Sequence, residues 1–230
     1  MQEFLGVKYD MRISNAVKRS RYCVTIYTDG YIIFRFKRQT SNKIKMCEDY
    51  IRDRKEYIEK TIEKLRKNKD KITKENNEYL NNYLSKNPNS LIIFNKSYDI
   101  SSLSIESISE MLYQKSINII DRISANMGVK YSKLTISTTK GYLGQCKRNK
   151  ANEHEIKIDY RLSLCDESLL EYLIVHELAH IRHKNHSPRF WQEVAKYYPN
   201  YKAVKTPIKD AANHASMILK HYNLLPKRLW

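Results

Sequence analysis

The chain has 230 residues, which is enough for one domain of ordinary size and an accessory region. Its net charge of +17 favours a negatively charged partner such as DNA or another polyanion, although abundant lysine is also typical of exposed helix surface. The sequence contains no run of 18 apolar residues and does not begin with a basic region followed by an apolar run. It therefore predicts neither a membrane span nor a secretory signal.

The cysteines also bear on the environment of the protein. They are Cys23, Cys47, Cys146 and Cys165, and no two of them have the C-x-x-C spacing of a zinc ribbon. Scattered cysteines of this kind do not indicate a disulfide framework. We therefore expect a cytoplasmic protein that has no membrane partner.

The first 40 residues are predicted to form β structure. Residues 22–27 and 31–36 are rich in β-branched and aromatic side chains, and the Asp29-Gly30 pair between them is typical of a hairpin turn. Residues 7–13 are expected to add a strand beside this hairpin.

A charged helix is expected after this β region. From about Lys45 to Asn68, apolar residues recur with helical spacing and charged residues fill the gaps, which predicts a helix that packs on one side only. Residues 69–90 are rich in Lys and Asn and contain Pro88, so we expect the helix to fade there into a polar connection. This basic helix is the segment that motivates a search for phosphate contacts.

The middle of the chain begins with a second predicted hairpin, around Asn95-Lys96. A helix with a broad apolar face follows and is expected to end at Gly128, because glycine is a typical C-cap. Ser107 has capping-box spacing for its start, although Ser104 would begin the helix one turn earlier.

Two more strands are predicted at residues 133–138 and 155–160, where apolar and polar residues alternate. Residues 141–146 between them are expected to form a bend. Two helices, at 187–198 and about 207–222, are expected near the C-terminal end of the sequence.

Between these strands and helices lies the motif His176-Glu177-Leu178-Ala179-His180, in a stretch whose apolar residues cover most of a helix circumference. Positions i and i+4 share one helix face, so His176 and His180 can bind one metal ion together. Glu177 is placed to act as general base for a metal-bound water. Polar side chains inside a buried helix need partners, and a metal ion would satisfy them.

A catalytic zinc site uses three protein ligands and keeps a fourth position open. We expect His186 to be the third ligand, because Asn185 can end the helix in a left-handed turn and Ser187-Pro188 can begin another helix. His183 competes for this role, but a third ligand on the same straight helix converges poorly on a tetrahedral site. We therefore place His183 at the surface or at the rim near substrate.

The run from Tyr172 to Trp191, YLIVHELAHIRHKNHSPRFW, closely resembles the YgjP-like, SprT-like zinc metallopeptidases. The signature of that family joins H-E-L-x-H to N-H-S-x-x-F-W at this spacing. The resemblance implies a minimal zincin-like catalytic domain in which Glu177 is the catalytic glutamate. It also implies that three histidines bind Zn²⁺, namely His176, His180 and His186.

Weaker similarity to the family covers residues 19–30 and 156–162. The chain departs from the family at Tyr142 to Cys146, where the family commonly has Arg-Trp-Gly-Ser-Cys and this sequence keeps only the Gly and the Cys. We interpret Cys146 as structural, because no positively charged neighbour in the local sequence would activate its thiolate.

Together, these features predict an α+β protein. Residues 1–100 are expected to form a β-hairpin-rich and basic helical accessory region, and residues 101–230 a minimal zincin-like domain with a mixed sheet packed on the H-E-x-x-H helix. We expect a zinc-dependent metallopeptidase that acts on protein or peptide substrates, with Glu177 as general base. Tyr160 and Arg161 join His183 as candidate substrate contacts.

Other functions stay open at this point. A DNA-associated protease would act on nucleic-acid-bound proteins, as relatives of the Spartan type do. A metal-dependent nucleotide pyrophosphatase ranks lower, because the chain has only five glycines and no glycine-rich loop that would bind phosphates. A protein that binds without catalysis is disfavoured by the intact Glu177. The metal itself is also open, since a three-histidine site would accept cobalt or nickel.

Overall fold

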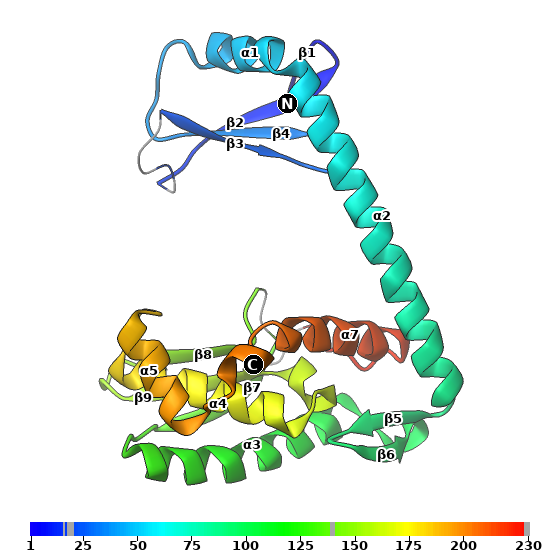
Figure 1. Ribbon diagram of the computed structural model, residues 1–230, viewed down its shortest axis with the longest axis vertical. Coiled ribbons are helices and arrows are strands. Elements are labelled where there is room, and N and C mark those ends of the chain that lie inside the picture. Colours follow the sequence, from blue (N-terminus) through cyan, green and yellow to red (C-terminus); the bar gives the residue numbers. More distant parts are fainter. Residues whose placement is uncertain (16, 18–20, 139–140, 228–230) are drawn as a thin grey trace. The chain divides into compact units, whose positions relative to one another are not determined.

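The computed structural model describes residues 1–15, 17, 21–138 and 141–227 (Figure 1). Residues 19 and 20, where the weaker family similarity begins, lie outside the described residues. The described chain has mixed α and β structure, as expected, and forms two compact units, Met1–Glu78 and Tyr79–Trp230. The boundary falls within one long helix, α2 (Lys55–Lys86). Each unit has its own buried core.

The first unit contains the predicted hairpin and the strand beside it. The hairpin strands pair antiparallel, with Ile26 opposite Ile32, and the 7–13 strand pairs with the hairpin in parallel. A short N-terminal strand that the sequence pattern did not predict completes a sheet of order β1-β2-β4-β3. The strands are β1 (Gln2–Phe4), β2 (Val7–Ile13), β3 (Tyr22–Ile26) and β4 (Ile32–Phe36).

One face of this sheet is covered by helical residues. Cys47 and Ile51 of α1 (Lys43–Asp53) and Ile58 of α2 share a buried core with Tyr9 and Phe34 of the sheet. Burial of such apolar surface is the main source of stability for a unit of this size.

The single helix predicted from Lys45 is in fact two helices. The break lies at Arg54, whose φ of −123° is outside the helical range. The predicted extension of the helix beyond residue 68 is confirmed, but it does not fade over residues 69–90, because α2 continues to Lys86. Four ion pairs between residues four positions apart follow its surface, and each such pair stabilises a helix by about 0.2–0.5 kcal/mol.

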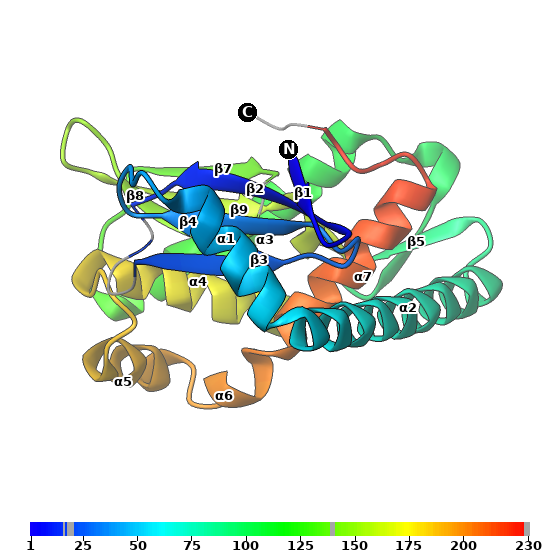
Figure 2. The same ribbon diagram turned by 90° about the horizontal axis from the view of Figure 1, so that it is seen from above.

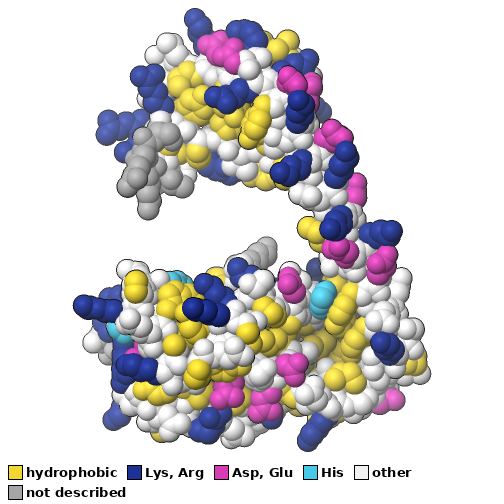
Figure 3. All heavy atoms as spheres, in the orientation of Figure 1, with side chains coloured by type: hydrophobic (Ala, Val, Ile, Leu, Met, Phe, Trp, Pro, Cys, Tyr) yellow, Lys and Arg dark blue, Asp and Glu magenta, His cyan; other side chains and the backbone are white. Residues whose placement is uncertain are grey.

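These ion pairs also show that the helix predicted to be basic carries acidic side chains among its lysines. Acidic and basic side chains alternate along α2, as in the pairs Lys60–Glu56 and Lys67–Glu63. Figure 3 shows Lys and Arg interspersed with Asp and Glu over the visible part of α2. Helix α2 therefore does not present a continuous basic surface.

The second unit holds the remaining elements, which Figures 1 and 2 show from two directions. Its centre is a mixed three-stranded sheet of order β7-β9-β8, in which β9 is parallel to β7 and antiparallel to β8. The expected bend at residues 141–146 is confirmed only in its first half, because the chain bends at Gly141 and Leu143 and the rest of the segment belongs to β8. The elements are β5 (Ser90–Ile93), β6 (Lys96–Asp99), η1 (Ile100–Ser102), α3 (Ile105–Met127), β7 (Lys133–Ser137), β8 (Gly144–Arg148), β9 (His154–Asp159), η2 (Tyr160–Leu164), α4 (Glu167–Arg182), α5 (Pro188–Tyr197), α6 (Tyr201–Val204) and α7 (Pro207–His221).

The core of the second unit lies between the sheet and helices α3 and α4. Helix α4 contacts α3, α5 and strands β8 and β9, so most of its circumference is buried, as predicted. The β5–β6 hairpin belongs to the same core through Leu91 and Ile93, which are fully buried. The functional division after residue 100 stays a prediction, since the structural boundary lies earlier, between Glu78 and Tyr79.

Two expectations from composition concern membranes and disulfides. No described helix combines the length and the apolarity that crossing a membrane requires. All four cysteines lie among the described residues and are free thiols.

Helix α3 shows how local sequence defines an element. Its N-cap is Ser104, one turn before the alternative at Ser107. The N–H of Ser107 donates to Ser104 Oγ at 3.1 Å, and the N–H of Ser104 donates to Ser107 Oγ at 2.9 Å. At the other end, Gly128 adopts the predicted left-handed conformation with a φ of 63°.

We expect Gly128→Ala to lower the free energy of unfolding by about 1–2 kcal/mol, because an L side chain is strained at positive φ. An added Cβ would come no closer than 3.7 Å to Arg182 Nη2, so the cost would lie in the backbone and not in a clash. Urea unfolding followed by circular dichroism measures the change. Gly128→Asn is the matched control and should lose less, since asparagine tolerates this conformation better. An unchanged midpoint for Gly128→Ala would contradict the prediction.

Candidate metal centre

Helix α4 holds the first two histidines of the motif. Its buried residues Leu170, Ile174 and Leu178 fix the helix in the core, and this leaves His176 and His180 on the face that is partly open. Their ring centroids lie 5.0 Å apart. The helix therefore presents both imidazoles to one point, as the i, i+4 spacing predicts.

The third histidine comes from the loop between α4 and α5. Helix α4 ends at Arg182 with an extended His183 as C-cap, and Asn185 is not among the described residues with positive φ. The expected left-handed turn at Asn185 is therefore wrong. His186 nevertheless lies beside the other two histidines. The helix α5 begins directly after it, with Ser187 as N-cap, whose Oγ accepts a hydrogen bond from the N–H of Phe190.

The three imidazoles converge. Nε2 of His186 lies 3.0 Å from Nε2 of His176, and one nitrogen of each of the three rings lies within 4.8 Å of the others. A tetrahedral zinc site with bonds of roughly 2.0–2.1 Å places its nitrogen ligands about 3.3 Å apart. The donor set therefore fits a metal ion of this kind, with adjustments of about an ångström in the positions of the rings.

The electrostatics of the site favour neutral imidazoles, which is the metal-binding form. Burial lowers the pKa of His176 to about 3, with further contributions from His180, His186 and Lys205. Burial also lowers the pKa of His180. Both rings therefore keep a lone pair available at neutral pH.

A backbone group orients one ligand. Nδ1 of His180 lies 3.0 Å from the carbonyl oxygen of His183, so Nδ1 carries the proton and donates to that carbonyl. The lone pair is then on Nε2, where it can bind a metal. His183 thus acts on the site through its backbone, in a way that reasoning about its side chain did not anticipate. The buried Nδ1 of His176 has no hydrogen-bond partner among the described residues.

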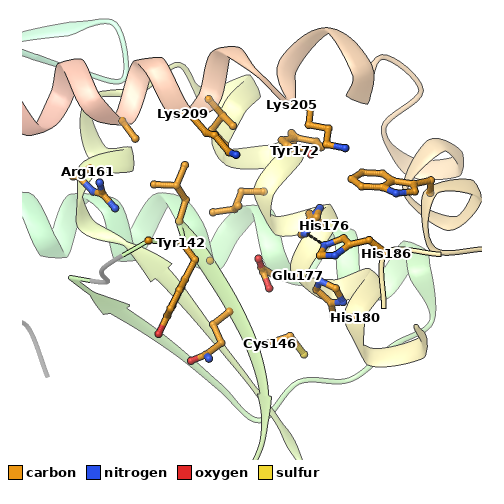
Figure 4. Close-up of a pocket in the computed structure, with 18 of the residues that line it drawn as sticks. Tyr142, Cys146, Arg161, Tyr172, His176, Glu177, His180, His186, Lys205 and Lys209 are labelled. Carbon is orange, nitrogen blue, oxygen red and sulfur yellow. Dashed lines mark hydrogen bonds between the residues drawn. The ribbon is translucent and has the colours of Figure 1, made fainter. Parts of the chain in front are cut away.

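Glu177 lies beside the imidazoles, with only 4% of its surface exposed (Figure 4). Burial raises its pKa to about 8, and a hydrogen bond from the backbone N–H of Cys146 opposes this rise. Strand β8 approaches so closely that a Cβ on Gly144 would lie 2.6 Å from Glu177 Oε1. Only glycine fits at this position without a shift of the carboxylate.

The thiol of Cys146 is part of the same surroundings. Burial, followed by the charge of Glu177, raises the pKa of Cys146 to about 11. The thiol therefore stays protonated at neutral pH and is a poor nucleophile. This agrees with the structural interpretation of Cys146.

A cavity of about 1090 Å³ opens over the histidines and Glu177. Figure 4 shows Tyr142 and Cys146 on one side of it and Lys205 and Lys209 on the opposite side. The described residues that line it come from β8 and the loop before it, from η2, from α4 and the loop after it, and from α5 to α7. They are Gly141, Tyr142, Leu143, Gly144, Gln145, Cys146, Arg161, Tyr172, Leu173, His176, Glu177, His180, Lys184, His186, Trp191, Lys205, Ile208, Lys209, Ala212 and Asn213.

The three candidate substrate contacts have different positions. Arg161 lines the cavity, and its guanidinium donates to the buried Asp159, with Nε 2.6 Å from Oδ1. Tyr160 is fully buried in the core, and neither it nor the His183 side chain is among the described residues that line the cavity. Burial of this kind does not favour Tyr160 as a substrate contact, and the roles of Tyr160, Arg161 and His183 stay predictions.

Several lining residues were not assigned to the site from the sequence. Gly144 was noted only as the glycine that this chain shares with the family's Arg-Trp-Gly-Ser-Cys segment, without a role. Trp191 packs on His186, with ring centroids 5.6 Å apart, and lines the cavity. Lys205 and Lys209 gave no local signal, because they are two of 42 Lys and Arg residues.

Comparisons with known proteins bear on the second unit. Residues 99–211 match the family model described as YgjP-like, metallopeptidase domain. This match confirms the resemblance predicted from the sequence and supports a metallopeptidase function.

Other comparisons add less. The crystal structure of the metallopeptidase zymogen of Pyrococcus abyssi abylysin is similar at 23% sequence identity and a TM-score of 0.36. That similarity covers 40% of this chain and 90% of the abylysin chain. A search of curated protein sequences gave no match.

We expect the purified protein to bind one zinc ion per chain, and His176→Ala or His186→Ala to remove most of it, because two imidazoles hold the ion weakly. Metal analysis by atomic emission after dialysis measures the content. His221→Ala is the matched control, since His221 is exposed on α7 and does not line the cavity. Equal zinc content in all four proteins would rule out this site.

Proposed function

We propose that this chain, whose residues 99–211 match a YgjP-like metallopeptidase domain, is a zinc-dependent metallopeptidase that hydrolyses peptide bonds. The observation that carries the proposal is the convergence of three imidazoles beside one buried carboxylate at the base of a cavity. His176, His180 and His186 would hold the ion, because Zn²⁺ suits neutral imidazole ligands.

When bound, the ion supplies Lewis-acid chemistry, which polarises a carbonyl group and lowers the pKa of water. Glu177 is placed to take the proton from the attacking water and to deliver it to the leaving amine. A base that must both accept and release a proton works best with a pKa near the working pH. Burial moves Glu177 in that direction, since it raises its pKa to about 8.

Strand β8 keeps this carboxylate in position. The N–H of Cys146 donates a hydrogen bond to the Glu177 carboxylate. The carboxylate occupies the space that a side chain at position 144 would fill, which is free because residue 144 is glycine. The strand therefore acts as a rigid support beside the reacting atoms, and a support of this kind is worth a large factor in rate.

The free edge of β8 suits an extended peptide. The carbonyl of Leu143 accepts from the N–H of Asp159, at 2.8 Å, so Leu143 faces β9. Residues alternate in an antiparallel pair, and Gly144 and Cys146 therefore turn their backbone groups to the outer edge. The N–H of Cys146 is used by Glu177, so the groups at this edge that a substrate could pair with are the N–H of Gly144 and the carbonyls of Gly144 and Cys146. Among the described residues, no further strand pairs with that edge. A substrate chain could add there by main-chain hydrogen bonds that do not depend on its sequence.

The two alternative substrate classes, DNA-bound proteins and nucleotides, have less support. Among the described residues, α2 alternates in charge, so it gives no specific reason to favour proteins bound to DNA. Of the five glycines, only Gly141 and Gly144 line the cavity, and a glycine-rich loop for nucleotide phosphates is not part of its lining. The unpaired edge of strand β8 beside the histidines therefore favours a peptide substrate over these two alternatives.

We expect Glu177→Gln to lower kcat/KM on an unfolded protein substrate by about 10²–10⁴-fold, because a general base is lost. Zinc content should stay at one ion per chain, since Glu177 is not a ligand. Wild type and variant are assayed side by side on unfolded protein, DNA-bound protein and nucleoside triphosphates. Activity that survives the substitution would remove Glu177 from the mechanism, and activity on nucleoside triphosphates alone would replace the peptidase proposal.

We also expect Gly144→Ala to lower kcat by about 10²-fold, because the new Cβ displaces the Glu177 carboxylate and a misplacement of about 1 Å has this effect. The three histidines come from other elements, so zinc content should not change. Lys147→Ala is the control, since Lys147 is an exposed residue of the same strand outside the cavity lining. Equal loss in the two variants would indicate general damage to β8 and would contradict a specific effect on Glu177.

A further inference from the structure

The charge of the cavity is strongly one-sided. Its described lining contains the cations Arg161, Lys184, Lys205 and Lys209, and its one carboxylate is that of the buried Glu177. Walls that carry one sign of charge around a cleft concentrate ligands of the opposite sign. The cavity over the histidines is therefore arranged to attract negative charge.

Three of these cations remain available to a ligand. Arg161 is already matched by the buried Asp159. Lys184, Lys205 and Lys209 are exposed, and in the described part of the chain they form no ion pair with a carboxylate. No carboxylate of the described residues neutralises these three charges, so an anionic group of a ligand could pair with them.

Lys205 and Lys209 have fixed places in the wall. Nζ of Lys205 lies 4.1 Å from the centre of the Trp191 ring, and that ring stacks on Tyr201 with centroids 5.1 Å apart. Such a cation–π contact restricts a lysine side chain that would otherwise be mobile. Lys209 lies one turn further, in the first turn of α7, where the partial positive charge of the helix N-terminus adds to its own.

The lysines lie opposite the strand edge. Figure 4 shows Lys205 and Lys209 on one side of the cavity, and Tyr142 and Cys146 of the β8 side on the other, with Glu177 and the histidines at one end. A chain that pairs with the β8 edge turns its side chains alternately to the two faces of the sheet, and those on the face toward Lys205 and Lys209 would meet the two ammonium groups. The two lysines can therefore discriminate between substrates by the charge of these side chains.

We propose that Lys205 and Lys209 make the site selective for acidic peptide segments, with Asp or Glu side chains close to the scissile bond. The inference rests on the proposed peptidase function and names its substrate class. The ammonium groups attract the carboxylates during encounter and hold them against the wall formed by α6 and α7. A lysine or arginine at the same substrate positions would be repelled.

Two matched peptides test the proposal. Both carry the same sequence around one cleavable bond, and they differ only in Glu or Gln at the two positions on each side of it. Their kcat/KM values with the zinc-loaded full chain give an acidic preference, and fluorescence anisotropy with zinc-loaded Glu177→Gln gives binding without cleavage.

The variants separate charge from shape. Lys205→Gln with Lys209→Gln removes both charges, and Lys205→Arg with Lys209→Arg keeps them. Lys202→Gln is the matched control, because Lys202 is exposed on α6 but does not line the cavity. All of these positions are on the surface, so the variants should fold, and circular dichroism checks this.

We expect wild type to prefer the acidic peptide by about tenfold at low salt, since two exposed ion pairs are worth about a factor of ten together. The double glutamine variant should lose the preference, and the double arginine variant and Lys202→Gln should keep it. The preference should also decrease at 0.5 M NaCl, because salt screens exposed charges.

Other outcomes have distinct meanings. Cleavage of both peptides without preference, or a preference that survives in the double glutamine variant, would overturn the inference and leave the peptidase intact. Lysine-dependent binding of the acidic peptide without cleavage would contradict the peptidase and still support recognition of acidic chains. Tighter lysine-dependent binding of ATP than of the acidic peptide, with hydrolysis of ATP, would overturn the inference in favour of a nucleotide.

Discussion

The candidate site depends on the close packing of strand β8 against helix α4 at Glu177. The strand comes so near that Gly144 leaves no room for a Cβ, and the N–H of Cys146 donates to the carboxylate. This one contact buries Glu177, fixes its direction and forms one side of the cavity.

The site combines neutral groups at its base with positive charge on its walls. Burial keeps His176 and His180 neutral and raises the pKa of Glu177, so the metal-binding end carries little charge of its own before an ion binds. Lys205, which directly follows α6, and Lys209 of α7, in contrast, stay exposed. In the proposed function, the reaction would fall to buried groups of α4 and the recognition of charge to these surface groups later in the chain.

Much of the fold could be predicted from local sequence. Hairpins with clear turn residues and helices with caps, such as α3 between Ser104 and Gly128, are defined by short-range chemistry and appear where expected. The failures have different causes. Strand β8 lacks an alternating apolar pattern and is a strand because it pairs with β9, while α2 is extended by ion pairs between its own exposed residues. Pairing across the sheet is invisible to a local pattern.

The sequence by itself determined the chemistry of the site. The spacing of His176, Glu177 and His180 on one helix face and the return of the chain at Ser187 fix a donor set that any fold of this helix would keep. Only the tertiary structure decided what surrounds it. The space left by Gly144, the carbonyl of His183 on His180, the burial of Tyr160 and the position of Lys205 and Lys209 depend on how elements distant in the chain pack. These positions and contacts result from the close packing of a common core, which no short stretch of sequence specifies.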